Sequence, residues 1–136
     1  MQVESAILAD FVQENNRKLY ITGGGIDTIF AQTIPVRHPS LGIAFRLILS
    51  PAELGRPHQL EILLVNADGG RLATVNAKIQ AERPPQGSGG WPVSVPLAIN
   101  FANIEFPAFG DYQFDLMVNN SSIENIRFRV IEAPAK

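Results

Sequence analysis

The chain has 136 residues, of which 46% are apolar and 18% are charged. This length fits a single domain spanning residues 1–136, and the composition is that of a folded, soluble protein rather than a disordered one. The absence of cysteine excludes disulfides and thiolate chemistry, and a net charge of −2 without any basic cluster argues against nucleic acid or an anionic membrane surface as partners.

Apolar side chains alternate along the opening segment, residues 3–11. Val3, Ile7 and Phe11 fall on one face, whereas Ala6 and Leu8 fall on the other. A period of two predicts a strand, and apolar residues on both faces predict that it is covered on both sides. This segment lacks the basic region of a signal peptide, and every apolar run in the chain is too short to span a membrane. We therefore expect a cytoplasmic protein.

Short strands separated by turn signals follow. Residues 15–17 predict the turn of a first hairpin, with further strands at 19–21 and 26–34. Segments 41–50 and 60–66 are the most apolar and are expected to lie inside their sheets, joined by a linker at 51–58 that holds one helical turn. Asp68-Gly69-Gly70 predicts a hairpin tip. The strand after it, 73–81, carries three alanines on one face, which indicates that something bulky packs across from it.

Residues 93–101 alternate cleanly as well, after a Pro/Gly/Ser-rich segment at 84–91 that predicts a loop. Pro96 lies inside this strand. Because proline donates no backbone hydrogen bond, the strand is expected at a sheet edge or with a bulge.

The clearest pattern is at the end of the chain, where apolar residues two apart run along two strands around a polar tip at 120–122. They are Tyr112, Phe114, Leu116 and Val118, then Ile126, Phe128 and Val130. The pattern predicts a hairpin with one buried face. The favoured register pairs Tyr112 with Val130, Phe114 with Phe128, Leu116 with Ile126, Asp115 with Arg127 and Gln113 with Arg129. Other registers with an even sum remain open.

Eight or nine short strands favour an antiparallel sandwich or a barrel. The sequence Gly110-Asp111-Tyr112-Gln113-Phe114 resembles the start of the penultimate strand of an immunoglobulin-like domain. In that fold the tyrosine hydroxyl holds the preceding corner, and Phe114 would occupy the place of the antibody cysteine. The resemblance implies an all-β, immunoglobulin-like sandwich of eight or nine strands.

A second resemblance involves most of the chain. The opening Val3-Glu4-Ser5-Ala6-x-Leu8-Ala9-Asp10, the run Gly23-Gly24-Gly25 and the ending Gly-x-Tyr-x-Phe resemble a small family of uncharacterised bacterial single-domain proteins. This resemblance implies one compact domain. It supplies no activity, cofactor or site residue.

Motifs for metals and phosphates are weak. The run 23–25 lacks dinucleotide spacing and a following Gly-Lys-Ser, so a loop with positive φ is the favoured interpretation. The only histidines, His38 and His58, each adjoin a proline, and a zinc site would need Glu53 or Asp27 as a third ligand. Solvated loop histidines are expected instead. Asp68 alone offers too few oxygens for calcium, so no metal or cofactor is predicted.

Enzyme signatures are equally sparse. The serines show no Gly-x-Ser-x-Gly elbow. Glu105 and Asp111 flank the 106–110 corner, and a glycosidase-like pair would require two carboxylates among Asp27, Glu53, Glu105 and Asp111 within about 10 Å. We expect a protein that is not an enzyme.

Trp91, at the end of the 84–91 loop, is the one candidate ligand-binding residue. An exposed ring there could stack on sugars, which gives a glycan-binding module as the alternative function. Large aromatic residues are usually buried, so Trp91 and nearby Phe101, Phe106 and Phe109 are expected to close the end of the core.

The sequence thus leaves the function unknown. It favours an interaction or accessory domain that binds another protein through loops or a sheet edge. The opening strand has few interior breakers, so it is the expected edge for a homodimer, and an enzyme using loop carboxylates is the third hypothesis.

Overall fold

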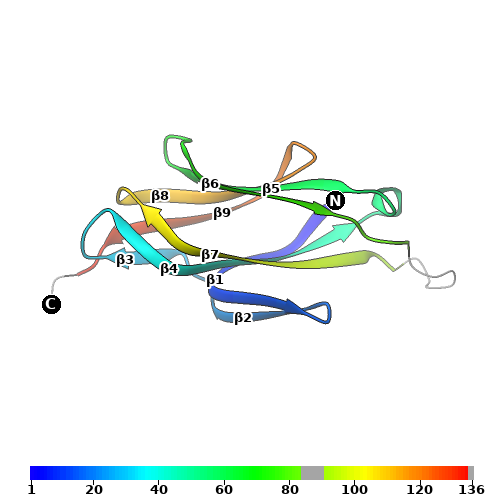
Figure 1. Ribbon diagram of the computed structural model, residues 1–136, viewed down its shortest axis with the longest axis horizontal. Helices are drawn as coiled ribbons and strands as arrows, with labels where there is room; N and C mark the ends of the chain where they lie inside the picture. The colour runs from blue at the N-terminus through cyan, green and yellow to red at the C-terminus, as the bar shows by residue number, and fades with distance from the viewer. Residues whose placement is uncertain (84–90, 135–136) are drawn as a thin grey trace.

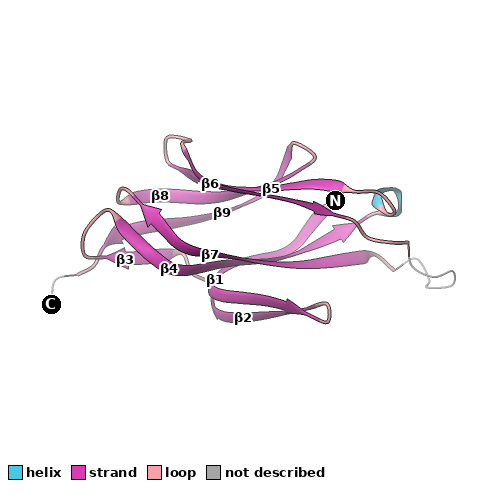
Figure 2. Ribbon diagram, in the orientation of Figure 1, coloured by secondary structure: helices cyan, strands magenta, loops and turns pink. Residues whose placement is uncertain are grey.

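The computed structural model describes residues 1–83 and 91–134, and strands dominate them (Figure 2). The only helix among these residues is the 3₁₀ turn η1 (Pro51–Glu53), which lies in the predicted linker. The strands are β1 (Gln2–Asn15), β2 (Lys18–Gly24), β3 (Thr28–Ala31), β4 (Val36–Leu49), β5 (His58–Asn66), β6 (Arg71–Ile79), β7 (Val93–Phe106), β8 (Gly110–Val118) and β9 (Ser121–Glu132). The all-β prediction is confirmed.

The strands form two sheets that pack face to face (Figure 1). One has the order β2-β1-β4-β7 and the other the order β3-β9-β8-β5-β6. β4 and β5 lie inside their sheets, as their apolar composition predicts, and β7 lies at an edge, as Pro96 predicts. The third predicted strand is shorter than expected: only Thr28–Ala31 pair, and they pair in parallel with β9 in the other sheet.

The main core fills the space between the sheets, and aromatic rings form its centre at the β8–β9 end. Phe114 lies 5.3 Å from Phe101 and 5.5 Å from Phe128, measured between ring centroids. The Tyr112 hydroxyl donates a hydrogen bond of 2.6 Å to the Ala108 carbonyl. This bond fixes the corner before β8, as the Gly-x-Tyr-x-Phe pattern predicts.

The predicted register of the last hairpin is wrong by two residues. Tyr112 faces Phe128, Phe114 faces Ile126 and Leu116 faces Glu124. Val130 therefore faces Gly110, Arg127 faces Gln113, Arg129 faces Asp111, and Asp115 faces Asn125. The cause is a tighter tip than expected: Asn119 and Asn120 both have positive φ, 50° and 68°, as a two-residue hairpin turn requires.

A bulge compensates for this tight turn. It lies between Leu116 and Met117, where Ile123 on β9 has no direct partner. The extra residue on β9 shifts the alternation of that strand by one, so Phe128 and Val130 face the core despite the odd pairing near the tip.

The β1–β2 hairpin leaves the plane of its sheet and forms a partial third layer (Figure 1). β1 pairs with β4 only as far as Ala9 opposite Gly42. Beyond that point, the Asn100 side chain on β7 accepts a hydrogen bond from Val12 N at 2.9 Å and donates one to Val12 O at 2.7 Å. On the side of β1 away from β2, the Asn100 amide thus supplies the hydrogen bonds that a neighbouring strand would give to Val12.

A second, smaller core lies beneath this hairpin. Ala9, Val12 and Ala44 are fully buried there, with Ala98 packed against them. The small residues on the outer face of β4 and β7 leave room for the hairpin. The opening strand is therefore covered on both sides, as predicted, with Leu8 in the main core and Val12 in the second one.

Candidate functional site

Neither histidine lies in a solvated loop, contrary to expectation. His58 begins β5 and is only 2% exposed. Its Nε2 lies 2.7 Å from the Glu53 carbonyl and its Nδ1 lies 3.0 Å from the Asn119 side-chain nitrogen. Both ring nitrogens thus have partners, and the His58 side chain links η1 to the turn between β8 and β9. His38 lies in β4, half-buried, rather than in a loop.

Of the four candidate carboxylates, Asp27 and Asp111 share a site, whereas Glu53 and Glu105 lie elsewhere. Glu105 lies 3.8 Å from Arg37 on an exposed edge. Asp27 and Asp111 line one shared groove, whereas Glu53 lines a different pocket. Across residues 1–83 and 91–134, no group of three or more His, Cys, Asp or Glu residues could hold a metal ion.

Glu53 has a structural partner at one end of the sandwich. Its Oε2 lies 2.8 Å from the ammonium group of Met1, and its Oε1 accepts hydrogen bonds from Ser50 N and Ser50 Oγ. Burial alone would raise the pKa of Glu53, but the bonds from the ammonium and from Ser50 outweigh it, so the pKa is lowered. This carboxylate is committed to holding η1 and β1 together.

The Gly23–Gly25 run has the predicted positive φ, but Gly23 and Gly24 end β2 and only Gly25 lies in the loop after it. Gly23 and Gly25 have φ of 66° and 92°, and the Gly25 and Ile26 amides both donate to the Leu8 carbonyl. A side chain at Gly23 would also collide with the Asp10 carboxylate. The positive φ values and the close approach to Asp10 explain why glycine stands at the end of β2.

Trp91 differs from the expectation of a core residue, because it is 80% exposed. Phe106 is buried as predicted, Phe101 is half-buried, and Phe109 is partly exposed. Trp91 lines an end pocket of about 510 Å³ together with Arg83, Glu53 and Leu54. Residues 84–90 of the predicted loop lie outside the described residues.

A broader groove of about 870 Å³ crosses the outer face of the five-stranded sheet. Its floor includes Leu63 and Val65, which are buried although they point away from the main core. Its walls carry both signs of charge in equal number: Arg71, Arg127 and Arg129, and Asp27, Asp111 and Asp115. This balance gives the groove no preference for an anion or a cation.

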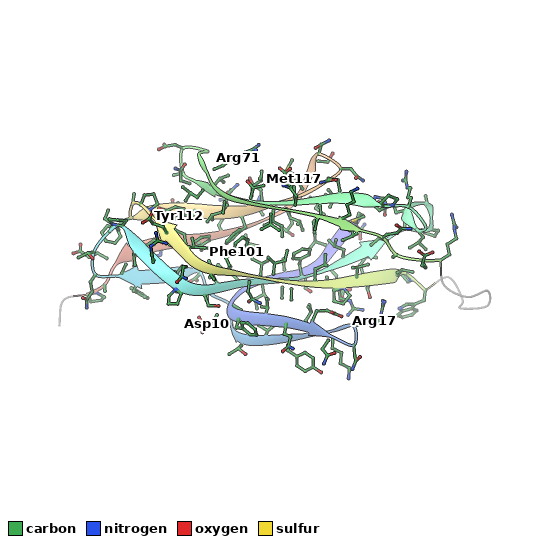
Figure 3. The ribbon with its side chains drawn as sticks, viewed as in Figure 1. Asp10, Arg17, Arg71, Phe101, Tyr112 and Met117 are labelled. Atoms are coloured by element: carbon green, nitrogen blue, oxygen red, sulfur yellow. The ribbon has the colours of Figure 1, made fainter. Side chains whose placement is uncertain are left out.

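The strongest candidate surface is the side of the sandwich where β6 and β7, the edge strands of the two sheets, lie open. Here the inward-facing residues are only half-buried, whereas those of the neighbouring β4 are buried. We call this surface the open flank and define it by Ala73, Val75 and Ala77 on β6 and by Val95, Leu97, Ile99 and Phe101 on β7. Figure 3 shows Phe101 between the two sheets.

The open flank is hollowed at one end. A groove of about 530 Å³ lies there, lined by Leu72 and Ala73 of β6, by Phe101 and Ile104 of β7, and by Pro107. Sequence reasoning anticipated bulk opposite the 73–81 alanines. The structure places Ala73 and Ala77 beside incompletely covered apolar side chains, with no further strand of the described residues over them.

The residues of β6 itself carry only positive charge, and they carry it on the outward face of the strand beside the open flank. This strand carries Arg71 and Lys78, both exposed, and no acidic residue. Neither side chain belongs to an ion pair within the described part of the chain. Figure 3 shows Arg71 at the margin of the molecule, near the β5–β6 turn.

The expected homodimer edge is covered in part. β2 pairs with β1 from Ala9 to Asn15, which leaves residues 2–7 paired only with β4. Self-association through this shorter stretch stays a prediction.

A family model matches residues 4–131, which include almost all of the nine strands. The chain belongs to this family, the family of unknown function DUF6941. The prediction of an uncharacterised family is confirmed. No curated protein matches the sequence. Membership of DUF6941 therefore identifies no activity, and a function has to be inferred from the surfaces of the protein. No helix in the described residues is long and apolar enough to cross a membrane.

Proposed function

We propose that this protein is a non-enzymatic interaction domain that binds another protein by accepting an extended segment of that partner along the free edge of β6. The single observation that carries the proposal is the open flank, where the inward-facing Val95, Leu97 and Ile99 of β7 and the small residues Ala73 and Ala77 of β6 are all only half-buried. A strand laid beside β6 would cover these side chains, and its backbone would pair with the unpaired groups of the edge.

β6 is a better acceptor than β7. Its nine residues, Arg71–Ile79, contain neither proline nor glycine, and they pair with β5 on one side only. β7 carries Pro96 within its length, and Asn103 has a positive φ of 53°, which interrupts the regular edge. Because strand addition needs a run of free backbone donors and acceptors, β6 offers the longer regular ladder.

The proposal includes an immunoglobulin-like classification of the fold. Its support is the strand order, in which β3 runs parallel to β9 while β8 and β5 follow in the same sheet. The Tyr112–Ala108 bond lies where that fold has its tyrosine corner. In a constant-type domain another strand follows the position that β7 holds, and no strand of the described residues follows β7 here. The proposed bacterial source follows from the resemblance of the opening residues, the Gly23–Gly25 run and the Gly-x-Tyr-x-Phe ending alone.

The test is a pull-down from native lysate with the tagged protein, in which the variant Ala77→Glu introduces a charge into the open flank. A partner in the proposed mode is lost with Ala77→Glu and retained with Thr22→Glu, a matched change at an exposed position of β2. With the purified partner, hydrogen exchange of the β6 amides should slow in the complex. A partner held equally by both variants, or protection confined to other strands, would overturn the proposal.

A second candidate function is glycan binding, and the exposure of Trp91 favours it. The ring is 80% exposed beside a pocket that also presents the polar side chains of Arg83, Gln2 and Ser50. Tryptophan emission should be red-shifted and quenched by iodide, since Trp91 is the only tryptophan. A glycan array should then show binding that Trp91→Ala removes. An array without signal, or signal unchanged in the variant, excludes this function.

A further inference from the structure

We infer that the partner segment alternates large apolar residues with acidic ones, so that it presents an apolar face to the core and a negative face to solvent. This inference rests on the proposed function, because it names the chemistry of the segment that β6 accepts. It follows from the two faces of β6 taken separately.

The inward face requires bulk at alternate positions. Side chains of an added strand point to opposite faces in turn, and every second one would lie beside Ala73, Val75 or Ala77. The alanine side chains are small and leave room for large side chains of the added strand. Large side chains there would reach Leu97 and Phe101 of β7, which are half-buried without them. Isoleucine, leucine or phenylalanine at alternate positions satisfies this geometry.

The outward face requires negative charge. On this face β6 presents Thr74, Asn76 and Lys78, and the bulge opposite Leu64 and Val65 brings Arg71 to the same face. The nearest acid on the adjacent strand, Glu61, faces Asn76 from the β5 side, away from the incoming segment. Opposite charges placed directly across two strands stabilise the pair, whereas like charges destabilise it.

The same charges argue against a second copy of β6 as the occupant. Two β6 strands side by side would bring together two copies each of Arg71 and Lys78, with no acidic residue from either strand. An acidic segment from another protein removes this repulsion and covers the same apolar surface. The occupant is therefore a partner of opposite charge.

The experiment uses three fluorescein-labelled peptides of nine residues, the length of β6. Isoleucine alternates with glutamate in the first, with lysine in the second and with threonine in the third. Anisotropy titrations of the full-length protein should show the glutamate peptide binding about tenfold more tightly than the lysine peptide, since two charge pairs change sign. Amide chemical shifts should change in β6 and not in β2.

Lys78→Glu supplies the decisive variant, with Lys18→Glu on β2 as the control of equal charge change. Lys78→Glu should lower the preference for the glutamate peptide at least to parity with threonine, whereas Lys18→Glu should leave it unchanged. Equal binding of all three peptides at β6 overturns the inference on charge but leaves strand addition intact. Binding of none, or shifts away from β6, overturns the inference, while the lysate experiment decides the proposed function independently. Sedimentation showing a β6-dependent dimer would identify a second copy as the occupant and overturn the inference as well.

Discussion

The outer face of β4 and β7 and the open flank both carry small residues on their strands, but they differ in what lies over them. Gly42, Ala44 and Ala98 lie beneath the β1–β2 hairpin, which the chain itself supplies. Ala73 and Ala77 have no such cover among the described residues. Small residues on a strand face thus mark room for another element, and only the structure shows whether that element belongs to the same chain.

The largest effect should come from filling the covered face. A Cβ at Gly42 would lie 2.7 Å from Asn100 Oδ1 and 3.1 Å from Val12 N. Gly42→Val should therefore lower the free energy of unfolding by about 2–3 kcal/mol, as overpacking of a closed space does. Urea denaturation measures the change, with Thr22→Val on the exposed face of β2 as the control. A stability equal to that of the control would mean that the hairpin is not held against β4.

A smaller loss is expected from removing the amide that holds the hairpin. Asn100→Ala leaves Val12 N and Val12 O without their side-chain partner. We expect a loss of about 1–3 kcal/mol, the usual result of leaving buried backbone groups unpaired. Hydrogen exchange should show the Val12 amide opening faster, while amides of β5 keep their protection. An unchanged Val12 amide would contradict this account.

The open flank should accommodate a larger side chain with little change in stability. Ala77→Leu places a larger side chain where the space is open, so the free energy of unfolding should change by less than about 1 kcal/mol. Together with Gly42→Val, this variant compares the same kind of enlargement on a covered and an uncovered face. A loss as large as that of Gly42→Val would show that the flank is already filled, and strand addition there would be excluded.

The smallest effect concerns the ion pair at the end of the sandwich. Because the pKa of Glu53 is lowered in the folded state, its carboxylate stabilises the fold above the unfolded pKa, and this contribution disappears as the pH falls through the folded value. Glu53→Gln should cost less than about 1 kcal/mol at neutral pH, given the partial exposure of the pair. The difference between the two proteins should shrink as the pH falls below the unfolded pKa and through the lowered folded pKa of Glu53. A difference that persists in acid would assign the effect to packing instead.

Much of the fold follows from local pattern, and the exceptions have local causes too. Pro96 and the apolar runs at 41–50 and 60–66 predict edge and interior strands correctly, because hydrogen-bonding capacity and burial act through single residues. The predicted register of the last hairpin is wrong because two adjacent asparagines both adopt positive φ and form a tight turn, and the pattern of apolar residues does not show this turn. The bulge next to Leu116 then restores the even register, so the alternation of apolar residues alone does not reveal the shift.

The features of the candidate site are harder to predict from the sequence than the fold is. The burial of His58 depends on η1 and on Asn119, which is 61 residues away in the chain. The exposure of Trp91 contradicts the usual burial of tryptophan, and no neighbouring residue signals it. The alanines of 73–81 predict bulk packed across from them, and this stays a prediction. The order of the strands, which makes β6 and β7 both edges, depends on pairing between distant segments.

The parallel pairing of β3 with β9 has a mechanical consequence. β1 begins at one end of the long axis and β9 finishes at the other, as Figure 1 shows. Tension applied along that axis would pull β9 lengthwise past both β3 and β8, and β1 lengthwise past β4. Hydrogen bonds that lie across the pulling direction share the load and break together, whereas a hairpin pulled open from its end loses them one at a time. Stretching along this axis would therefore load these strand ladders in shear.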